Sequence, residues 1–304
     1  MKKLVVNADD VGIDWDRDIG IGIGVWFRAI SSISVVVTNP ASHSRIQRLA
    51  RWIRKFRPRV SIGLHLNLTD EPFCTCTLES ILEREIGFDH PKVAFWKSAI
   101  QQNINLSNIS REISAQLQQF QRLFSFQPTH LDGHNHCHIA HPLIFQEICT
   151  QYNSHIRIPN ESLLKENLQT LLSNLELEKD YFSCEGKQNP LLWAHTMRES
   201  PISDLLLYRY SSSLLSPISA KKFIGSIYGH IRTYSFLKKN LQQSFESTDI
   251  LELMVHPGFY FPVPHSTWFS NKERLQELWN LVRLQRYLKK QHIKIVNQDG
   301  LEID

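Results

Sequence analysis

The sequence predicts an α/β fold, a distorted (β/α) barrel of the TIM type that forms one domain over residues 1–304. Two observations predict it. Short β-branched runs alternate with longer stretches of helical period, which is typical of parallel βα units, and seven such runs occur, a number that suits a barrel. In addition, no internal repeat, low-complexity tract or proline-rich linker divides the chain, and 304 residues of 42% hydrophobic content can bury one large core.

Each expected strand is a short apolar run that ends near a polar residue. The strands are expected at residues 4–8, 33–38, 60–66, 129–132, 155–158, 251–256 and 293–296. Helices are expected at about 17–30, 42–56, 106–124, 142–152, 161–176, 218–239 and 272–290. The last helix has the clearest pattern, because apolar residues recur every three positions from Leu275 to Tyr287. The aromatic residues of about 160–250 fit no simple βα repeat, so this segment is interpreted as an excursion, or lid, over the barrel mouth.

Charge and cysteine usage exclude several classes of protein. The net charge of +4 is mild for this length, and the basic cluster Arg51, Arg54, Lys55, Arg57 and Arg59 is interpreted as a solvated helix face, so no nucleic-acid partner is expected. No window approaches the ~20 apolar residues of a membrane span, and no signal-peptide core follows Met1, so no membrane partner is expected. The five cysteines are an odd number without paired spacing, which favours a reducing, cytoplasmic setting.

The most informative feature is a histidine cluster at residues 130–141, which holds five of the fourteen histidines and includes Asp132. Imidazole is a common ligand of transition metals. Asp9 and Asp10 end the first expected strand, His65 ends the third and His256 ends the sixth. Because the active sites of (β/α) barrels lie at the carboxyl ends of the strands, these side chains are expected to converge on one metal site.

Four motifs carry a family resemblance. They are Asn-Ala-Asp-Asp-Val-Gly at 7–12, Gly-Leu-His-Leu-Asn-Leu-Thr at 63–69, Pro-Thr-His-Leu-Asp-Gly-His at 128–134 with two further histidines, and His-Pro-Gly at 256–258. In this order, from residue 4 to about 260, they resemble the YdjC-like carbohydrate deacetylases, a family that includes enzymes acting on chitooligosaccharides. The resemblance implies a barrel related to other polysaccharide deacetylases. The chain departs from the family pattern at Val11, where Phe is common, at Asp18, where Asn often stands, and in a longer segment between Arg157 and Leu251; these departures concern substrate preference.

The resemblance also implies roles for the matched positions. Asp10, His65 and His134 match metal ligands, Asp9 matches the catalytic base and His256 matches a general acid. The chemistry agrees, because amide hydrolysis benefits from a metal that polarises the carbonyl and activates water, and one carboxylate with two imidazoles leaves coordination positions open. One divalent ion is therefore expected as cofactor, Mg²⁺ by resemblance, whereas the two imidazoles favour Zn²⁺ or Mn²⁺.

Other polar residues near these motifs are expected to support the site. If residues 134–138 continue as an extended strand, His134, His136 and His138 share one face, and the latter two contact substrate or support the metal ligands. His130 and Asp132 are expected to orient His134. Asn67 is expected to hydrogen-bond sugar or the metal-bound water. Arg157 is expected to contact substrate or to neutralise a carboxylate. A purely structural ion pair is an equal alternative.

Taken together, the sequence predicts a metal-dependent hydrolase that removes the N-acetyl group from an acetylated sugar or short oligosaccharide. Two alternatives stay open: a metal-dependent phosphoesterase or glycosidase, and a sugar-binding barrel without turnover. A phosphoesterase would more often carry a Gly-rich loop or a basic phosphate cradle, and neither adjoins the motifs. The expected partner is a small acetylated carbohydrate, and a homodimer is compatible with the sequence.

Overall fold

The computed structural model describes residues 1–82, 91–100, 102–159, 222–225, 234–259 and 271–303. The strands are β1 (Lys3–Val11), β2 (Ser32–Val35), β3 (Ser61–Leu66), β4 (His130–Gly133), β5 (His155–Ile156), β6 (Lys222–Ile224), β7 (Ile250–Val255) and β8 (Lys294–Ile295). The α-helices are α1 (Trp15–Trp26), α2 (His43–Phe56), α3 (Leu78–Leu82), α4 (Pro91–Ile100), α5 (Leu106–Phe124), α6 (Pro142–Gln151), α11 (Tyr234–Ser244) and α12 (Asn271–Lys290). Two 3₁₀ helices lie at Pro40–Ser42 and His134–Ile139.

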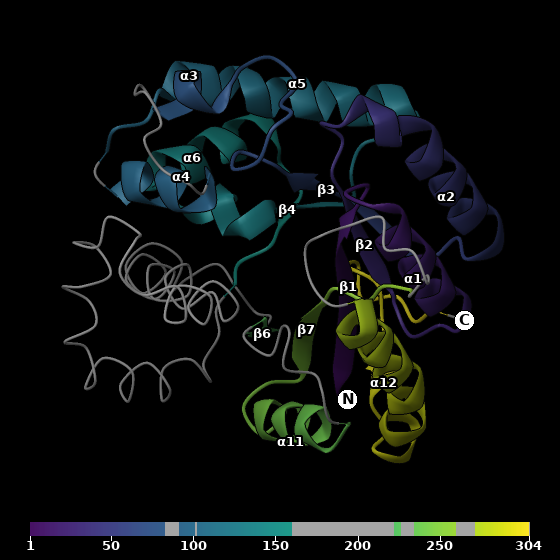
Figure 1. Ribbon diagram of the computed structural model, residues 1–304. Coiled ribbons are helices and arrows are strands. Elements are labelled where there is room, and N and C mark those ends of the chain that lie inside the picture. Colours follow the sequence, from purple (N-terminus) through teal and green to yellow (C-terminus); the bar gives the residue numbers. More distant parts are fainter. Residues whose placement is uncertain (83–90, 101, 160–221, 226–233, 260–270, 304) are drawn as a thin grey trace.

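The strands form a parallel half-barrel. The described strands follow the order β5-β4-β3-β2-β1-β7-β6, and β8 pairs with the start of β1. Helices α1, α2, α5, α6 and α12 surround the strands (Figure 1). Each of these strand pairs is parallel, so the carboxyl ends of the strands meet at one edge. The predicted barrel-like α/β class is therefore confirmed.

Most of the predicted elements are confirmed, and one is wrong. All seven predicted strands occur, as do the helices predicted at 17–30, 42–56, 106–124, 142–152 and 272–290. The helix predicted at 218–239 is wrong over its first part, because Lys222–Ile224 forms β6 and pairs with β7. Tertiary pairing decides this short segment, and α11 begins only at Tyr234. Helices α3 and α4 were not predicted, and the helix predicted at 161–176 lies outside the described residues, as does most of the predicted lid.

The first strand bends where its acidic residues begin. Its apolar residues from Leu4 to Ala8 are buried in the centre of the sheet. The register with β2 then shifts between Ala8 and Val11, and Asp10 has a φ of 69°. Such bulges re-aim side chains, and Asp tolerates the left-handed region better than most residues. The bulge turns Asp10 toward partners that differ from those of Asp9.

The segment after β4 does not continue as a strand. Residues His134–Ile139 form a 3₁₀ turn in which Asn135 and His136 have φ values of 53° and 54°. The predicted common face of the three histidines at 134, 136 and 138 is therefore wrong. The histidine pattern resembles strand alternation, but the chain turns at the end of β4 to enter α6, which begins with His141 as its N-cap and Pro142.

Among the described residues, no helix combines the length and the apolar character that crossing a bilayer requires.

Candidate metal centre

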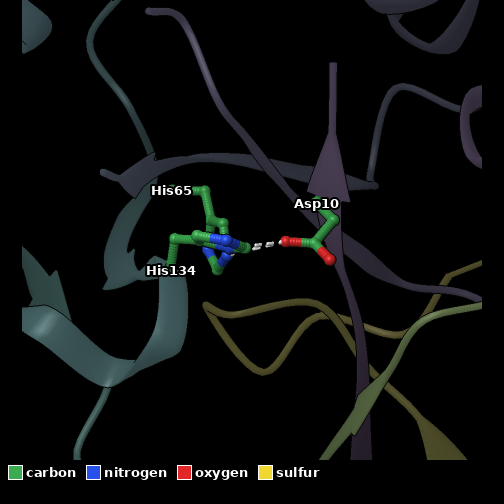
Figure 2. Close-up of side chains that lie close together, drawn as sticks. All are labelled: Asp10, His65 and His134. Atoms are coloured by element: carbon green, nitrogen blue, oxygen red, sulfur yellow. Dashed lines mark hydrogen bonds and ion pairs between the residues drawn. The ribbon is translucent and has the colours of Figure 1, made fainter. Parts of the chain in front are cut away.

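Three side chains meet at the carboxyl edge of the sheet (Figure 2). Asp10 comes from the bulge in β1, His65 from the end of β3 and His134 from the start of the turn after β4. Asp10 Oδ1 lies 2.9 Å from His134 Nδ1 and 3.3 Å from His65 Nε2. The candidate ligand atoms of the three residues all lie within 4.8 Å of one another. The structure thus brings together the residues predicted to hold a metal.

The spacing of these atoms fits a small divalent cation. Metal–nitrogen and metal–oxygen bonds of about 2.0–2.2 Å place neighbouring ligand atoms roughly 2.8–3.6 Å apart at octahedral or tetrahedral angles. The two separations at Asp10 Oδ1, 2.9 and 3.3 Å, fall in this interval. Two imidazoles and one carboxylate form a donor set that leaves coordination positions open, as a catalytic site requires. The set does not by itself select one metal.

A buried carboxylate fixes the orientation of His65. Asp132 Oδ1 lies 2.7 Å from His65 Nδ1, so the other ring nitrogen, Nε2, faces Asp10. This carboxylate–histidine pair is the arrangement that commonly orients a metal-ligating imidazole. Burial alone would lower the pKa of His65, but the carboxylates of Asp132 and Asp10 outweigh it and raise the pKa to about 10. A cation at this position is thus strongly favoured by the surrounding charge.

This pairing corrects the prediction that Asp132 and His130 orient His134. Asp132 contacts His65 instead. His130 is buried beside Thr129, 3.0 Å from its hydroxyl, and its ring covers Gly63, where an added Cβ would lie only 2.4 Å from the ring. His130 therefore packs the interior of β3 and β4. The prediction failed because adjacent strands, rather than adjacent residues, supply the partners.

The second histidine has its own carboxylate, which the sequence analysis missed. Asp70 Oδ2 lies 3.0 Å from His134 Nε2, on the opposite side of the ring from Asp10. Asn67 holds the Asp70 backbone, because its amide accepts the Asp70 N–H at 3.0 Å and donates to the Asp70 carbonyl at 2.5 Å. Asn67 thus shapes the loop after β3. The sequence does contain a signal for Asp70, because it is an acid four residues beyond the end of β3, at the same edge of the sheet as the other candidates.

Arg17 is a further unpredicted neighbour of the site. Its Nη1 lies 2.6 Å from Asp10 Oδ2, and its Nε lies 3.0 Å from Asp14. Burial would raise the pKa of Asp10, but Arg17 and His134 hold it well below its usual range. One oxygen of Asp10 is thereby held by Arg17, and the other faces the two imidazoles. The sequence signal for Arg17 is that it is the one basic residue in the acidic run 14–18 at the start of α1.

Arg157 contacts three buried acids, one of which, Asp132, also contacts the candidate metal ligand His65. Its guanidinium contacts Asp9 at 2.7 and 2.8 Å, Asp132 at 2.7 Å and Glu252 at 2.7 Å. The side chains of all four residues are at most 6% exposed. These contacts are ion pairs with buried carboxylates, which agrees with two of the alternatives predicted for Arg157, whereas substrate contact stays a prediction. Asp9 is also held by Asn7 Nδ2 at 2.7 Å, so its carboxylate has a fixed orientation.

His256 lies at the end of β7, with its Nε2 3.9 Å from Asp10 Oδ2. Two residues of α12 hold its backbone: Glu277 accepts its N–H at 2.8 Å, and Arg274 donates to its carbonyl at 2.8 Å. Burial lowers the pKa of His256 to about 3, so the ring is neutral at neutral pH. The apolar pattern of this helix gave no signal for Glu277 and Arg274, because their contacts with His256 depend on how the helix packs against β7.

The last two predicted histidines lie on the far side of the turn. His138 Nε2 contacts the Arg157 carbonyl at 2.9 Å, and burial lowers the pKa of His138 to about 4, so the neutral ring donates this hydrogen bond. His136 packs edge-on against Phe223 of β6, with ring centroids 5.9 Å apart. Burial holds the pKa of His136 well below its usual range. His138 therefore supports Arg157, and substrate contact by His136 stays a prediction.

The fold and the site define a class of protein: a parallel α/β half-barrel with an Asp–His–His cluster at the carboxyl edge of its sheet. Within this class, the chain belongs to the family of YdjC-like proteins, whose family model matches residues 3–287. The predicted family is therefore confirmed.

Named relatives support the same family. The chain is 30% identical over 275 residues to a carbohydrate deacetylase of Danio rerio, covering 84% of this chain and 82% of the relative. It is 33% identical over 165 residues to a carbohydrate deacetylase of Xenopus laevis, covering 52% of this chain and 51% of the relative, so the match spans about half the length of that protein. A chitooligosaccharide deacetylase of Proteus mirabilis is 28% identical over 193 residues, with 61% and 71% covered.

A solved structure shares the fold. It comes from Enterococcus faecalis, carries the description of a cellobiose-phosphate cleavage protein, and superposes with a TM-score of 0.65 at 16% identity, covering 99% of both chains. At this identity the similarity concerns the fold alone.

Proposed function

We propose that the protein is a metal-dependent carbohydrate deacetylase that hydrolyses the N-acetyl group of an acetylated sugar or short chitooligosaccharide. The observation that carries the proposal is the cluster of Asp10, His65 and His134 at the carboxyl edge of the sheet. Its spacing fits a divalent cation, and relatives over most of the chain carry the names of carbohydrate and chitooligosaccharide deacetylases. No observation on the described residues favours a phosphoesterase, a glycosidase or a sugar-binding barrel.

Asp10, His65 and His134 would hold the metal. When bound, a divalent cation supplies a Lewis acid that polarises the acetyl carbonyl and lowers the pKa of a water molecule. Asp132 and Asp70 keep the two imidazoles in place from behind, and Arg17 restricts Asp10 to one free oxygen. Mg²⁺, Zn²⁺ and Mn²⁺ all remain within the proposal, because the donor set does not separate them.

Asp9 is proposed as the general base. The two contacts from Arg157 and the one from Asn7 fix its carboxylate, and its position one residue before Asp10 places it at the same strand end. Asp9 takes a proton from the attacking water while the new C–O bond forms at the acetyl carbon. A base fixed in this way needs no reorientation during the reaction, which is where general-base catalysis gains its efficiency.

His256 is proposed as the general acid. The C–N bond breaks only if the departing amine nitrogen gains a proton, and His256 is the histidine at the end of β7 that would supply it. Because the pKa of His256 is lowered to about 3, the free protein holds this ring neutral. His256 must therefore gain a proton during the reaction before it can protonate the amine nitrogen. Asp9 removes one proton from water for each proton that His256 delivers, so the number of protons is conserved. The products are acetate and the free amino sugar.

The test is acetate release from N-acetylglucosamine and N,N'-diacetylchitobiose by the purified protein, with Mg²⁺, Zn²⁺, Mn²⁺ or a chelator. Release that requires metal is expected. His134→Ala is expected to lose both metal binding and activity, whereas Asp9→Asn is expected to retain metal binding and lose ~10²- to 10⁴-fold in turnover. His155→Ala is the matched control, because this imidazole is 52% exposed and contacts Asp299 on the surface.

Two results would contradict the proposal. Stoichiometric metal binding without acetate release from either sugar would exclude these substrates. Full activity in the chelator or in His134→Ala would exclude the metal mechanism. Release of phosphate from a sugar phosphate, without acetate release, would instead support the phosphoesterase.

The proposed cellular setting follows from the cysteines. Cys74, Cys76, Cys137 and Cys149 are free thiols in the described part of the chain. Burial and the nearby Glu112 carboxylate raise the pKa of the half-buried Cys76 to about 12, so this thiol is protonated and poorly reactive. Free thiols of this kind support a reducing, cytoplasmic environment.

A further inference from the structure

A group of aromatic side chains lies on the surface formed by α1, α2 and α12. Trp26, Phe27, Phe56 and Trp279 are each between 45% and 51% exposed, and Trp52 is partly buried among them. Their rings are in contact: Trp26 with Trp52 at 5.9 Å, Trp52 with Phe56 at 6.1 Å, and Phe27 with Trp279 at 6.3 Å. Figure 1 shows the three helices side by side, with α1 between α2 and α12. We call these five residues the aromatic patch.

Basic side chains accompany the aromatic patch. Arg57 stacks on Trp26 with its guanidinium 4.9 Å from the ring and donates to the Trp26 carbonyl at 2.9 Å. The Lys55 ammonium lies 5.1 Å from the Phe56 ring. Arg48 lies one turn before Trp52 on the same helix face, and both Arg48 and Lys55 are exposed.

The two stretches of chain that contain the aromatic patch carry basic residues and no acidic ones. Residues 19–69 contain eight Lys and Arg residues and no Asp or Glu, and residues 278–293 contain four and none. These two stretches thus hold twelve of the thirty-four basic residues and none of the thirty acidic ones, which leaves twenty-two basic and thirty acidic residues in the rest of the chain. The mild net charge of +4 therefore conceals an excess of basic residues in the two stretches that contain the patch, and the rest of the chain is net negative.

The patch lies away from the candidate metal centre. Helices α1 and α2 run back from the carboxyl edge of the sheet, and their last residues, Trp26 and Phe56, lie near the amino ends of β2 and β3. The candidate metal ligands Asp10, His65 and His134 lie at the carboxyl ends of the strands. A partner bound at the patch would therefore leave the metal centre open to solvent.

The geometry points to one partner: we propose that the aromatic patch adsorbs to the anionic headgroup layer of a phospholipid membrane. Trp and other aromatic rings favour the boundary between headgroups and acyl chains, and Lys or Arg beside them are attracted to anionic lipids. A second copy of the chain fits poorly, because two faces of the same positive sign repel. A nucleic acid would need ring faces free for stacked bases, whereas these rings pack at tilts of 38–56° against one another.

This proposal revises two expectations from the sequence. The basic cluster at 51–59 was interpreted as a solvated helix face, and the absence of a membrane span suggested no membrane partner. Surface adsorption requires no spanning helix, only an amphipathic face with cations. Only the tertiary structure places Trp26, Phe27 and Trp279, from two other helices, beside this cluster.

The test is flotation of the whole protein with vesicles of phosphatidylcholine alone or with about 30% phosphatidylserine. Binding is expected only to the anionic vesicles, and it should fall as salt rises from about 0.05 M to 0.5 M. Arg48→Glu with Lys55→Glu should weaken binding by at least ~25-fold, since each removed cation is worth on the order of fivefold. Phe56→Ser with Trp279→Ser should weaken binding without changing the charge.

The matched control is Arg111→Glu with Lys239→Glu, which makes the same charge change at exposed positions on α5 and α11 and should leave most binding intact. Circular dichroism confirms that each variant is folded. Equal binding to neutral vesicles, or an equal loss in the control variant, would overturn the proposal. Binding to a single-stranded RNA but not to vesicles, or a dimer that Phe56→Ser dissociates, would also overturn it by assigning the patch to another partner.

Discussion

The side chain of Arg157 offers the most informative perturbation, because it neutralises three buried acids at once. Arg157→Met keeps an apolar stem and removes the guanidinium together with its charge. The substitution removes two hydrogen bonds to Asp9, one to Asp132 and one to Glu252, all of 2.7–2.8 Å. Since the acids are at most 6% exposed, water cannot replace the guanidinium.

The magnitude follows from this burial. Breaking one buried ion pair costs about 3–5 kcal/mol, because a charge stays behind without a partner. Three acids depend on Arg157, so we expect a loss at or above this range, against a total stability of roughly 5–15 kcal/mol for a typical domain. Guanidinium unfolding at pH 7 measures the loss as a lower midpoint. Arg51→Met, at an exposed position on α2, is the control and should stay within about 0.5 kcal/mol of the parent protein.

The pH dependence supplies an independent check. In the parent protein, Arg157 and His65 outweigh burial and hold the pKa of Asp132 well below its usual range, so its stabilising contribution is present above pH ~4 and is lost as the pH falls further. In Arg157→Met, Asp132 loses this partner, and protonation relieves its buried charge as the pH falls toward about 4. The difference between the two proteins should therefore shrink from pH 7 to pH 4. A loss below about 1 kcal/mol, or a difference independent of pH, would refute this account of the network.

Three further variants test other parts of the site. Asp132→Asn removes the charge behind His65 and should weaken metal binding ~10- to 100-fold in calorimetric titration; unchanged affinity would show that the pair does not serve the metal. Burial outweighs the hydrogen bond from the backbone and raises the pKa of Glu277 to about 7, so stability should fall as the pH rises from about 4.5 to 7. Glu277→Gln keeps the acceptor and should be more stable than the parent by on the order of 1–3 kcal/mol at pH 8 and equal near pH 4.5, unless ionised Glu277 contributes something that Gln cannot. Gly63→Ala places a methyl group 2.4 Å from the His130 ring and should cost ~1–3 kcal/mol in thermal unfolding, whereas a neutral result would mean that the ring moves aside freely.

The fold class and the positions of the candidate metal ligands were readable from the sequence because both depend on local patterns. Apolar runs that end in polar residues mark the ends of parallel strands, and those ends meet at one edge whatever the detailed packing. Asp10, His65 and His134 could therefore be placed at this edge from the sequence, and the resemblance of their motifs to those of the family implied their role as metal ligands. The short strand β6 was misassigned, since three residues carry too little periodicity to outweigh their helical surroundings.

What only the tertiary structure decided is which side chain contacts which. Asp132 orients His65 rather than His134. Asp70 contacts His134, and Arg17 contacts Asp10. Two residues of α12 hold the backbone of His256. The physical reason is that ion pairs and hydrogen bonds form over about 3 Å between residues far apart in the chain, and their partners depend on register, bulges and helix placement. A sequence shows which groups reach the edge of a sheet; packing alone determines how their charges are paired.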